Sequence, residues 1–171
     1  MVWVADFLYG FGTAYLEKCT LSLRSCGGGI TAWKGTNTTF INKYGVYLDN
    51  TQVMAANSTI ASKIKGKCAL GRPWNAQHRS IFMNSTLDAS ILPAGYIIWS
   101  TATPNLNNLT LMATWSDSGP GYNVTAEKAS NVTKVLDDAG VQPYRWPVDV
   151  FEGPDGTPGD ISWIDASVLV G

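Results

Sequence analysis

The 171-residue chain is poor in charge. Only 15% of its residues are charged, and 12 Lys and Arg nearly balance 13 Asp and Glu. Without a basic stripe, the sequence argues against nucleic acid as a partner. No apolar run approaches the roughly 18 residues that a membrane-spanning helix needs, so we expect no membrane association. Hydrophobic residues, at 45%, are instead sufficient for one domain with a substantial core.

Histidine and cysteine are also scarce. The chain has one histidine, His78, and three cysteines, Cys19, Cys26 and Cys68, with no C-x-x-C spacing. We therefore expect neither a metal site nor a cofactor. Cys19 and Cys26 can form a disulfide, which leaves Cys68 buried or paired elsewhere. Because the sequence has no Gly-x-Ser-x-Gly elbow, His78 is expected to have a surface or capping role and not a catalytic one.

N-glycosylation sequons are more frequent than the composition explains. Six of the 11 Asn residues begin an N-x-Ser/Thr sequon, whereas about two would arise by chance with 29 Ser and Thr in 171 residues. This density is typical of a secreted eukaryotic glycoprotein, although the first residues do not resemble a signal peptide. We therefore expect an extracellular protein whose leader lies upstream. The sequons begin at Asn37, Asn57, Asn84, Asn108, Asn123 and Asn131.

Short β-rich segments bounded by Gly, Asn and Pro dominate the chain. Strands are predicted at residues 15–21, 30–33, 45–48, 51–54, 80–87 and 109–113. Similar polar-apolar units recur about every 30 residues, which favours a solenoid. A Greek-key sandwich is the competing architecture. It predicts more Asn-Gly or Asp-Gly hairpin turns than the single Asp155-Gly156 pair.

One helix is predicted near the C-terminus. It spans residues 126–139, with Thr125 as its N-cap and Gly140 just past its end. Its apolar positions, among them Val132 and Leu136, form a stripe that should pack on the body of the domain. The Pro/Gly-rich segment 153–159 is predicted to be a loop.

Two motifs, separated by about sixty residues, resemble those of a known family. Residues 6–10 read DFLYG and residues 70–74 read LGRPW. Between and after them, in the expected order, come ITA at 30–32, LPAGY at 92–96 and SGPG at 118–121. Together these segments resemble the pectin methylesterases, or pectinesterases. The loop style and the density of sequons also look fungal.

The resemblance implies an all-β fold, a right-handed parallel β-helix with a short C-terminal helix. Residues 1–171 would be a single partial catalytic domain, with β-helix coils at about 1–123 and the helix and tail at 124–171. The family's general acid and oxyanion-hole glutamines lie upstream of the DFLYG-like motif, so the domain is expected to be truncated at its N-terminus. A solenoid cut in this way exposes strand edges that invite self-association or pairing with another chain.

The resemblance also assigns roles to four side chains. Asp6 would be the nucleophile that removes methyl esters from pectin, and Arg72 would hold it by charge-assisted hydrogen bonds. Trp74 and Trp99 would pack on sugar rings in the cleft. The implied partner is methyl-esterified polygalacturonate. Since the acid and the oxyanion hole are missing, we expect this chain to be nearly inactive.

Two alternatives stay open. The first is a non-catalytic β-helix that binds pectin or another acidic glycan. The second is a lyase or polygalacturonase on the same fold. The sequence shows neither the calcium-binding carboxylates of a lyase nor the clustered aspartates with a histidine that a polygalacturonase needs.

Overall fold

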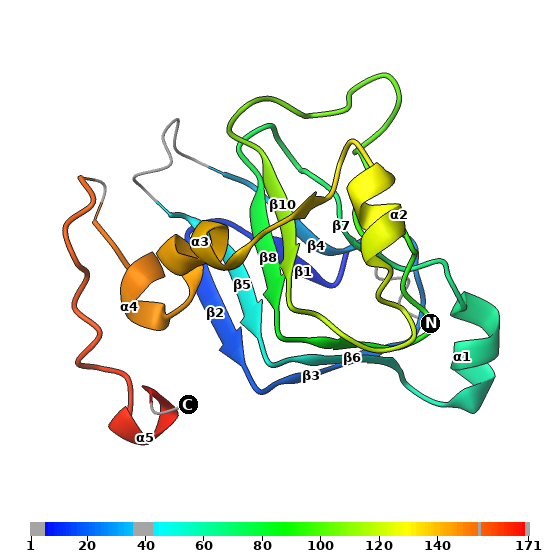
Figure 1. Cartoon of the computed structure of the whole chain (residues 1–171), viewed down its shortest axis with the longest axis horizontal. Helices are drawn as coiled ribbons and strands as arrows, with labels where there is room; N and C mark the ends of the chain where they lie inside the picture. Colours follow the sequence, from blue (N-terminus) through cyan, green and yellow to red (C-terminus); the bar gives the residue numbers. More distant parts are fainter. Residues whose placement is uncertain (1–5, 36–42, 154, 170–171) are drawn as a thin grey trace.

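The chain folds into a parallel β-helix with three sheets around its interior (Figure 1). The computed structural model describes residues 6–35, 43–153 and 155–169. Sheet A contains β1 (Leu8–Gly10), β4 (Gly29–Trp33) and β7 (Ala69–Gly71). Sheet B contains β2 (Thr13–Glu17), β5 (Gly45–Asp49), β8 (Arg79–Met83), β10 (Leu111–Trp115) and β11 (Lys134–Val135). Sheet C contains β3 (Thr20–Leu23), β6 (Gln52–Ala55) and β9 (Thr86–Leu87).

The first three coils each contribute one strand to each sheet, and neighbouring coils pair in parallel. Sheet B has two further strands, β10 and β11. Thr13 of β2 lies opposite Gly45 of β5, 32 residues later in the chain. β3 and β6 repeat the same offset, with Thr20 opposite Gln52. The recurrence of about 30 residues seen in the sequence is therefore the length of one coil, and the predicted solenoid is confirmed.

A left-handed residue turns the chain from sheet B to sheet C in every coil. Lys18, Asn50, Asn84 and Ser116 have φ angles of 52°, 49°, 48° and 54°. The N–H groups of the first three donate to the carbonyls of Asp49, Met83 and Trp115 in the next coil. Asparagine tolerates this conformation better than most residues, which accounts for its place at two of the four corners.

Side chains that alternate in direction along the strands contribute to two separate hydrophobic cores. In β5, Val46 and Leu48 point into the solenoid, where they join Phe82 and Leu70. Tyr47, between them, points outward and stacks on Tyr144 with ring centroids 5.8 Å apart. The outer face of sheet B is thus covered by the C-terminal segment, so β5 and β8 are buried on both faces.

The predicted helix at 126–139 is wrong in its extent. Helix α2 covers only Val124–Ala129, and its N-cap is Asn123 instead of Thr125. Beyond it the chain returns to sheet B as β11, so strand pairing continues past residue 123. Shorter helices follow, namely α3 (Asp138–Val141), the 3-10 turn η1 (Gln142–Tyr144), α4 (Pro147–Val150) and α5 (Ala166–Leu169), while α1 (Ser58–Ile64) lies between β6 and β7.

The disulfide joins Cys26 to Cys68, and Cys19 is free, so the pairing of Cys19 with Cys26 was wrong. β3 runs between Cys19 and Cys26, and four extended residues separate its ends by about 13 Å. Coil stacking instead brings the Cα atoms of Cys26 and Cys68 to 5.0 Å. Within the described ranges, no helix has the length and apolarity required to cross a membrane.

Candidate functional site

Asp6 and Arg72 meet at the outer face of sheet A. Arg72 donates from Nε to Asp6 Oδ1 and from Nη2 to Asp6 Oδ2, both at 2.9 Å. Their side chains are 16% and 20% exposed, so solvent and substrate can reach a pair that is largely shielded. This bidentate arrangement fixes the direction of the carboxylate. The structure therefore brings the two residues together, while their catalytic roles stay predictions.

Three consecutive coils position this pair. Asp6 lies just before β1, Gly29 begins β4 and Arg72 follows β7, so the three residues come from successive coils of sheet A. The Gly29 N–H donates to Asp6 Oδ1 at 3.0 Å and adds a third hydrogen bond to the carboxylate. A Cβ at Gly29 would lie 2.7 Å from the Arg72 backbone nitrogen. Glycine is required there because the coils approach so closely.

Trp99 contacts the guanidinium directly. Its ring centroid lies 4.2 Å from Arg72 Cζ, within the range of a cation–π interaction. Trp74 is 44% exposed, and its ring centroid lies 6.4 Å from that of Tyr9. The two indoles thus occupy different places, one against Arg72 and one in contact with solvent.

The Trp74 loop is held by a residue that the sequence analysis missed. Asn105 donates from Nδ2 to the Pro73 and Trp74 carbonyls, at 3.1 and 2.9 Å. It comes from the loop before β10 and has a φ of 56°. Tyr9 lies inside the DFLYG motif and was available as a candidate, as was Gly29 at the end of a glycine run. No sequence signal singles out Asn105.

His78 is fully buried and belongs to the solenoid wall, so the expected surface or capping role is wrong. Its Nδ1 lies 3.0 Å from both the backbone nitrogen and the carbonyl oxygen of Trp33, and its Nε2 lies 2.8 Å from Ser80 Oγ, so the tautomer decides which ring nitrogen donates. Burial lowers the pKa of His78 to about 4. The histidine is therefore a neutral internal hydrogen-bonding group, far from any catalytic arrangement.

The sequons differ in accessibility. Four of the six asparagines are exposed, at 57, 108, 123 and 131. Asn84 is half-buried, and its Nδ2 donates to Asp49 Oδ1 at 2.8 Å. Asn37 lies outside the described residues. Since a glycan attaches at Nδ2, the half-buried Asn84 amide is less accessible to modification than the four exposed asparagines.

The site offers one carboxylate and one guanidinium beside aromatic rings. In the described ranges, no group of three or more His, Cys, Asp or Glu side chains could hold a metal ion. The Asp6 carboxylate accepts hydrogen bonds from Arg72 and Gly29. The arrangement suits attack by a carboxylate on an electrophilic carbon next to a ring-shaped substrate.

Comparison with known proteins places these features in a family. The Pectinesterase family model matches residues 2–145. The chain is 30% identical over 167 residues to the Arabidopsis thaliana protein "Probable pectinesterase/pectinesterase inhibitor 17". This alignment covers 95% of the chain and 30% of the Arabidopsis protein. A second Arabidopsis thaliana protein, "Probable pectinesterase/pectinesterase inhibitor 58", is 33% identical over 124 residues, or 69% of this chain and 21% of its own length. These relatives are plant proteins, so they do not support a fungal origin.

A solved structure shares the fold. The pectin methylesterase from carrot superposes with a TM-score of 0.71 at 20% identity, over 98% of this chain and 50% of the carrot chain. The chain thus spans about half of that structure and less than a third of the two curated relatives. Because the family model matches residues 2–145, which make up most of the chain, the chain belongs to the pectinesterase family.

Proposed function

We propose that this chain takes part in removing methyl esters from pectin, with Asp6 as the nucleophile. The single observation that carries the proposal is the bidentate Asp6–Arg72 pair beside Trp99. A carboxylate is a weak nucleophile, and its attack depends on being ionised and aimed. The guanidinium and the Gly29 N–H hold the carboxylate in one direction. Family membership supports the reaction class, a carboxylic ester hydrolase.

The reaction would proceed in two steps. An oxygen of Asp6 bonds to the ester carbonyl carbon, the bond from that carbon to the methoxy oxygen breaks, and methoxide takes a proton and leaves as methanol. Water then attacks the resulting anhydride and restores the Asp6 carboxylate, which frees the galacturonate carboxyl group. Arg72 keeps the attacking oxygen in line throughout, and Trp74 and Trp99 offer faces for sugar rings.

We expect a low rate from the chain alone. The described contacts of Asp6 include no second acid to protonate methoxide and no pair of donors for the oxyanion. A general acid contributes about 10² to 10⁴ in rate, and one oxyanion donor about 10² to 10³. The same observation favours a second candidate function. In that case the chain is a non-catalytic β-helix that binds pectin through the aromatic residues Tyr9, Trp74 and Trp99.

We further propose that the protein is extracellular and glycosylated. The six sequons and the disulfide between Cys26 and Cys68 support this placement, because disulfides persist in oxidising compartments. Pectin, the substrate class of the family, is the polymer that such a protein would meet.

Methanol release from methyl-esterified pectin tests the proposal. The purified chain should release methanol slowly but above a buffer blank, and Asp6→Asn should abolish the release. Asp165→Asn, which changes an exposed aspartate outside the site, should leave it unchanged. Equal release by the Asp6→Asn variant would exclude the nucleophile. Retention on a pectin column with no methanol at all would favour the binding function instead.

A further inference from the structure

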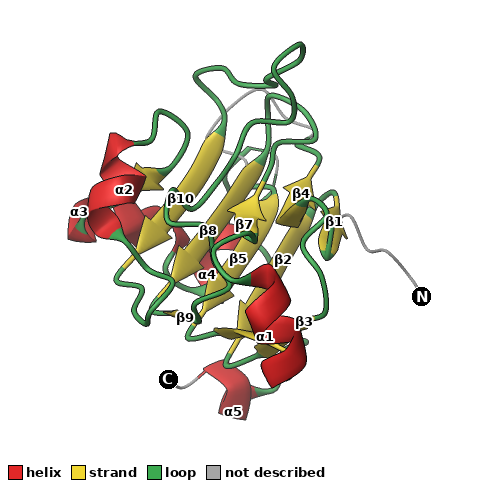
Figure 2. Ribbon diagram, turned by 90° about the vertical axis from the view of Figure 1, so that its right-hand side faces the viewer, coloured by secondary structure: helices red, strands yellow, loops and turns green. Residues whose placement is uncertain are grey.

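The loop that leads into β10 contacts the candidate site at two places. It runs from Trp99 to Thr110 and projects beyond the sheets on the side where β8 and β10 begin, as Figure 1 and Figure 2 show. At its start, the Trp99 ring lies against Arg72, with 4.2 Å between the ring centroid and Cζ. Farther along, Asn105 bonds the segment that carries Trp74. One loop therefore supplies the first indole and holds the second.

Asn105 restrains the backbone on both sides of the Trp74 Cα atom. Its Nδ2 donates to the Pro73 carbonyl at 3.1 Å and to the Trp74 carbonyl at 2.9 Å. The first carbonyl belongs to the peptide group before this Cα atom, and the second belongs to the peptide group after it. Because peptide groups are planar, holding both carbonyls restrains the two backbone torsions of Trp74. A single amide thus sets the direction in which the indole leaves the chain.

Other hydrogen bonds brace the same segment at positions beyond Trp74. Thr110 Oγ1 donates to the Ala76 carbonyl at 2.6 Å. On the side of β4, the Asn75 side-chain amide exchanges two hydrogen bonds with the backbone of Gly35, at 2.8 and 3.0 Å. The indole N–H of Trp74 makes no hydrogen bond within residues 6–35, 43–153 and 155–169. The orientation of this ring therefore depends on how its backbone is held.

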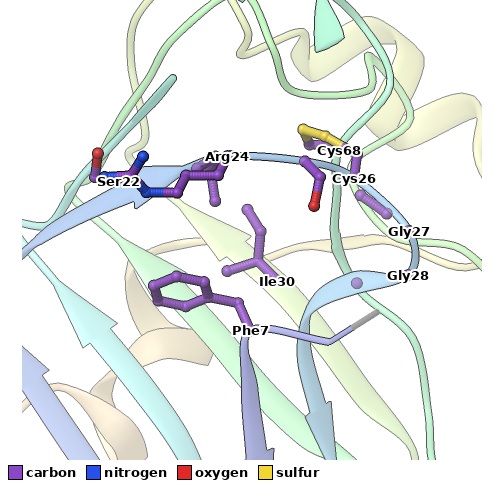
Figure 3. Close-up of a pocket in the computed structure, with 12 residues that line it drawn as sticks. Phe7, Ser22, Arg24, Cys26, Gly27, Gly28, Ile30 and Cys68 are labelled. Atoms are coloured by element: carbon purple, nitrogen blue, oxygen red, sulfur yellow. A yellow bond between two sulfur atoms is a disulfide. The ribbon is translucent and has the colours of Figure 1, made fainter. Parts of the chain in front are cut away.

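The aromatic surface at Trp74 is the one that suits a sugar ring. Trp74 and Tyr9 are 44% and 67% exposed, and their ring centroids lie 6.4 Å apart. An apolar cavity of about 390 Å³ lies elsewhere, between Phe7, Ile30 and the Cys26–Cys68 disulfide (Figure 3). Neither Trp74 nor Tyr9 lines it. Exposed ring faces, which pack well on the C–H face of a sugar, are thus found at Trp74 and not in the cavity.

We propose that Asn105 is a positioning residue for Trp74 and holds its indole in the orientation that receives a sugar ring of pectin. This inference rests on the proposed function, since Trp74 contacts the polymer in both forms of it. Without Asn105, Trp74 would sample several orientations, and the apparent affinity would fall by the fraction of molecules in the competent one. Asn105 acts through the indole and does not take part in the chemistry of Asp6.

Two substitutions remove the hydrogen bonds and keep the loop conformation. Asn105 has a φ of 56°, which glycine adopts freely and aspartate tolerates. Asn105→Gly deletes the amide, and Asn105→Asp replaces it with a carboxylate that cannot donate to the two carbonyls. Asn108→Asp is the matched control, because it adds the same charge to the same loop at an exposed position. Such a control is needed because pectin is itself an anion. All variants are made without N-glycans, so the loss of the Asn108 sequon has no effect.

The first measurement is the affinity for a partially methyl-esterified oligogalacturonate by titration calorimetry. Asn105→Gly and Asn105→Asp should raise Kd by about three- to tenfold, whereas Asn108→Asp should raise it by less than about twofold. Trp74→Ala should also raise Kd, and adding Asn105→Gly to it should cause no further change. A loss that persists in the Trp74→Ala background would mean that Asn105 acts on the fold or on the sugar directly, and would overturn the inference.

The second measurement needs no substrate. With 5-fluorotryptophan in place of tryptophan, the fluorine signal of Trp74 is identified by its absence from Trp74→Phe. Asn105→Gly should shift or broaden this signal and leave that of Trp33, in the solenoid core, unchanged. An unchanged Trp74 signal would overturn the positioning role whatever the affinity for pectin. A shifted signal in a protein that binds no oligogalacturonate, or binds it equally well as Trp74→Ala, would instead confirm the positioning and count against the proposed function.

Discussion

At the residue scale, the geometry of Arg72 is more informative than its charge. Its planar guanidinium bonds both oxygens of Asp6 while its face lies 4.2 Å from the Trp99 ring centroid. A lysine can supply the charge, but it cannot make two parallel bonds or stack in the same way. The orientation of the carboxylate therefore depends on arginine specifically.

Arg72→Lys should lower methanol release by about 10- to 100-fold, since one charge-assisted hydrogen bond contributes about 1.5–3 kcal/mol. Arg24→Lys, at an exposed position outside the pair, should have no effect. The comparison is best made at saturating pectin, in the form of the protein that shows the highest activity. A rate within twofold of the wild type for Arg72→Lys would show that bidentate orientation is unimportant.

His78 should titrate far below the usual range for histidine. Its pKa is lowered to about 4 by burial, whereas an unfolded histidine titrates near 6.5. As the pH falls, the unfolded state binds the proton first. The contribution of His78 to the free energy of unfolding is therefore constant above about pH 6.5, declines toward pH 4 and then levels off. The shift corresponds to roughly 3 kcal/mol.

Because His78 is the only histidine, its ring C–H signals in NMR report this pKa without ambiguity. A direct readout is preferable because burial raises the pKa of Asp117 and gives an opposite contribution to the dependence of stability on pH. A midpoint near 6.5 in the folded protein would contradict the buried, neutral ring.

Sequence motifs anticipated the proximity of Asp6 and Arg72 but not the environment of His78. The first follows from motif order, since coils stack residues that are distant in sequence. The second depends on which face of a wall strand points inward and on the Trp33 backbone N–H, which has no signature in the local sequence. The placement of Trp99 on Arg72 likewise requires the loop geometry.

At the scale of elements, tertiary pairing overrides local helix propensity near the C-terminus. The apolar periodicity at residues 126–139 predicted one helix, but β-branched Val132 and Thr133 interrupt it. The Thr133 hydroxyl donates to the Ala94 carbonyl and accepts the Tyr96 N–H, which ties the segment to residues 94–96. β11 then pairs with β10. Partners that lie this far apart in the sequence cannot be inferred from a short stretch of neighbouring residues.

The corner residues between sheets B and C offer a test of this repeat. Asn50 is exposed, with a φ of 49°. Asn50→Val should destabilise the protein by about 1–2 kcal/mol, since a β-branched side chain fits the left-handed region poorly. Asn50→Gly should be close to neutral because glycine adopts this conformation freely. Urea unfolding measures both, and equal losses would mean that the corner conformation is not the cause.

At the scale of the whole molecule, the fold combines two stabilising arrangements. The solenoid interior holds one core, and the C-terminal segment seals a second core against the outer face of sheet B. The Lys43 ammonium bonds the Asp149 carbonyl and Glu152 Oε1, both at 2.8 Å, and so fastens this segment to the coil before β5. The Cys26–Cys68 disulfide adds a covalent link between neighbouring coils.

Removing that disulfide should weaken the whole domain. Cys26 and Cys68 are 42 residues apart, and closing a loop of this length in the unfolded chain is worth up to about 4 kcal/mol. The double variant Cys26→Ala and Cys68→Ala should therefore unfold at a clearly lower guanidinium concentration. Cys19→Ala removes the free, half-exposed thiol and should change stability by less than about 0.5 kcal/mol. If both variants unfold at the same guanidinium concentration as the wild type, the disulfide contributes nothing to stability. Strand pairing and packing between the coils would then be sufficient to maintain the solenoid.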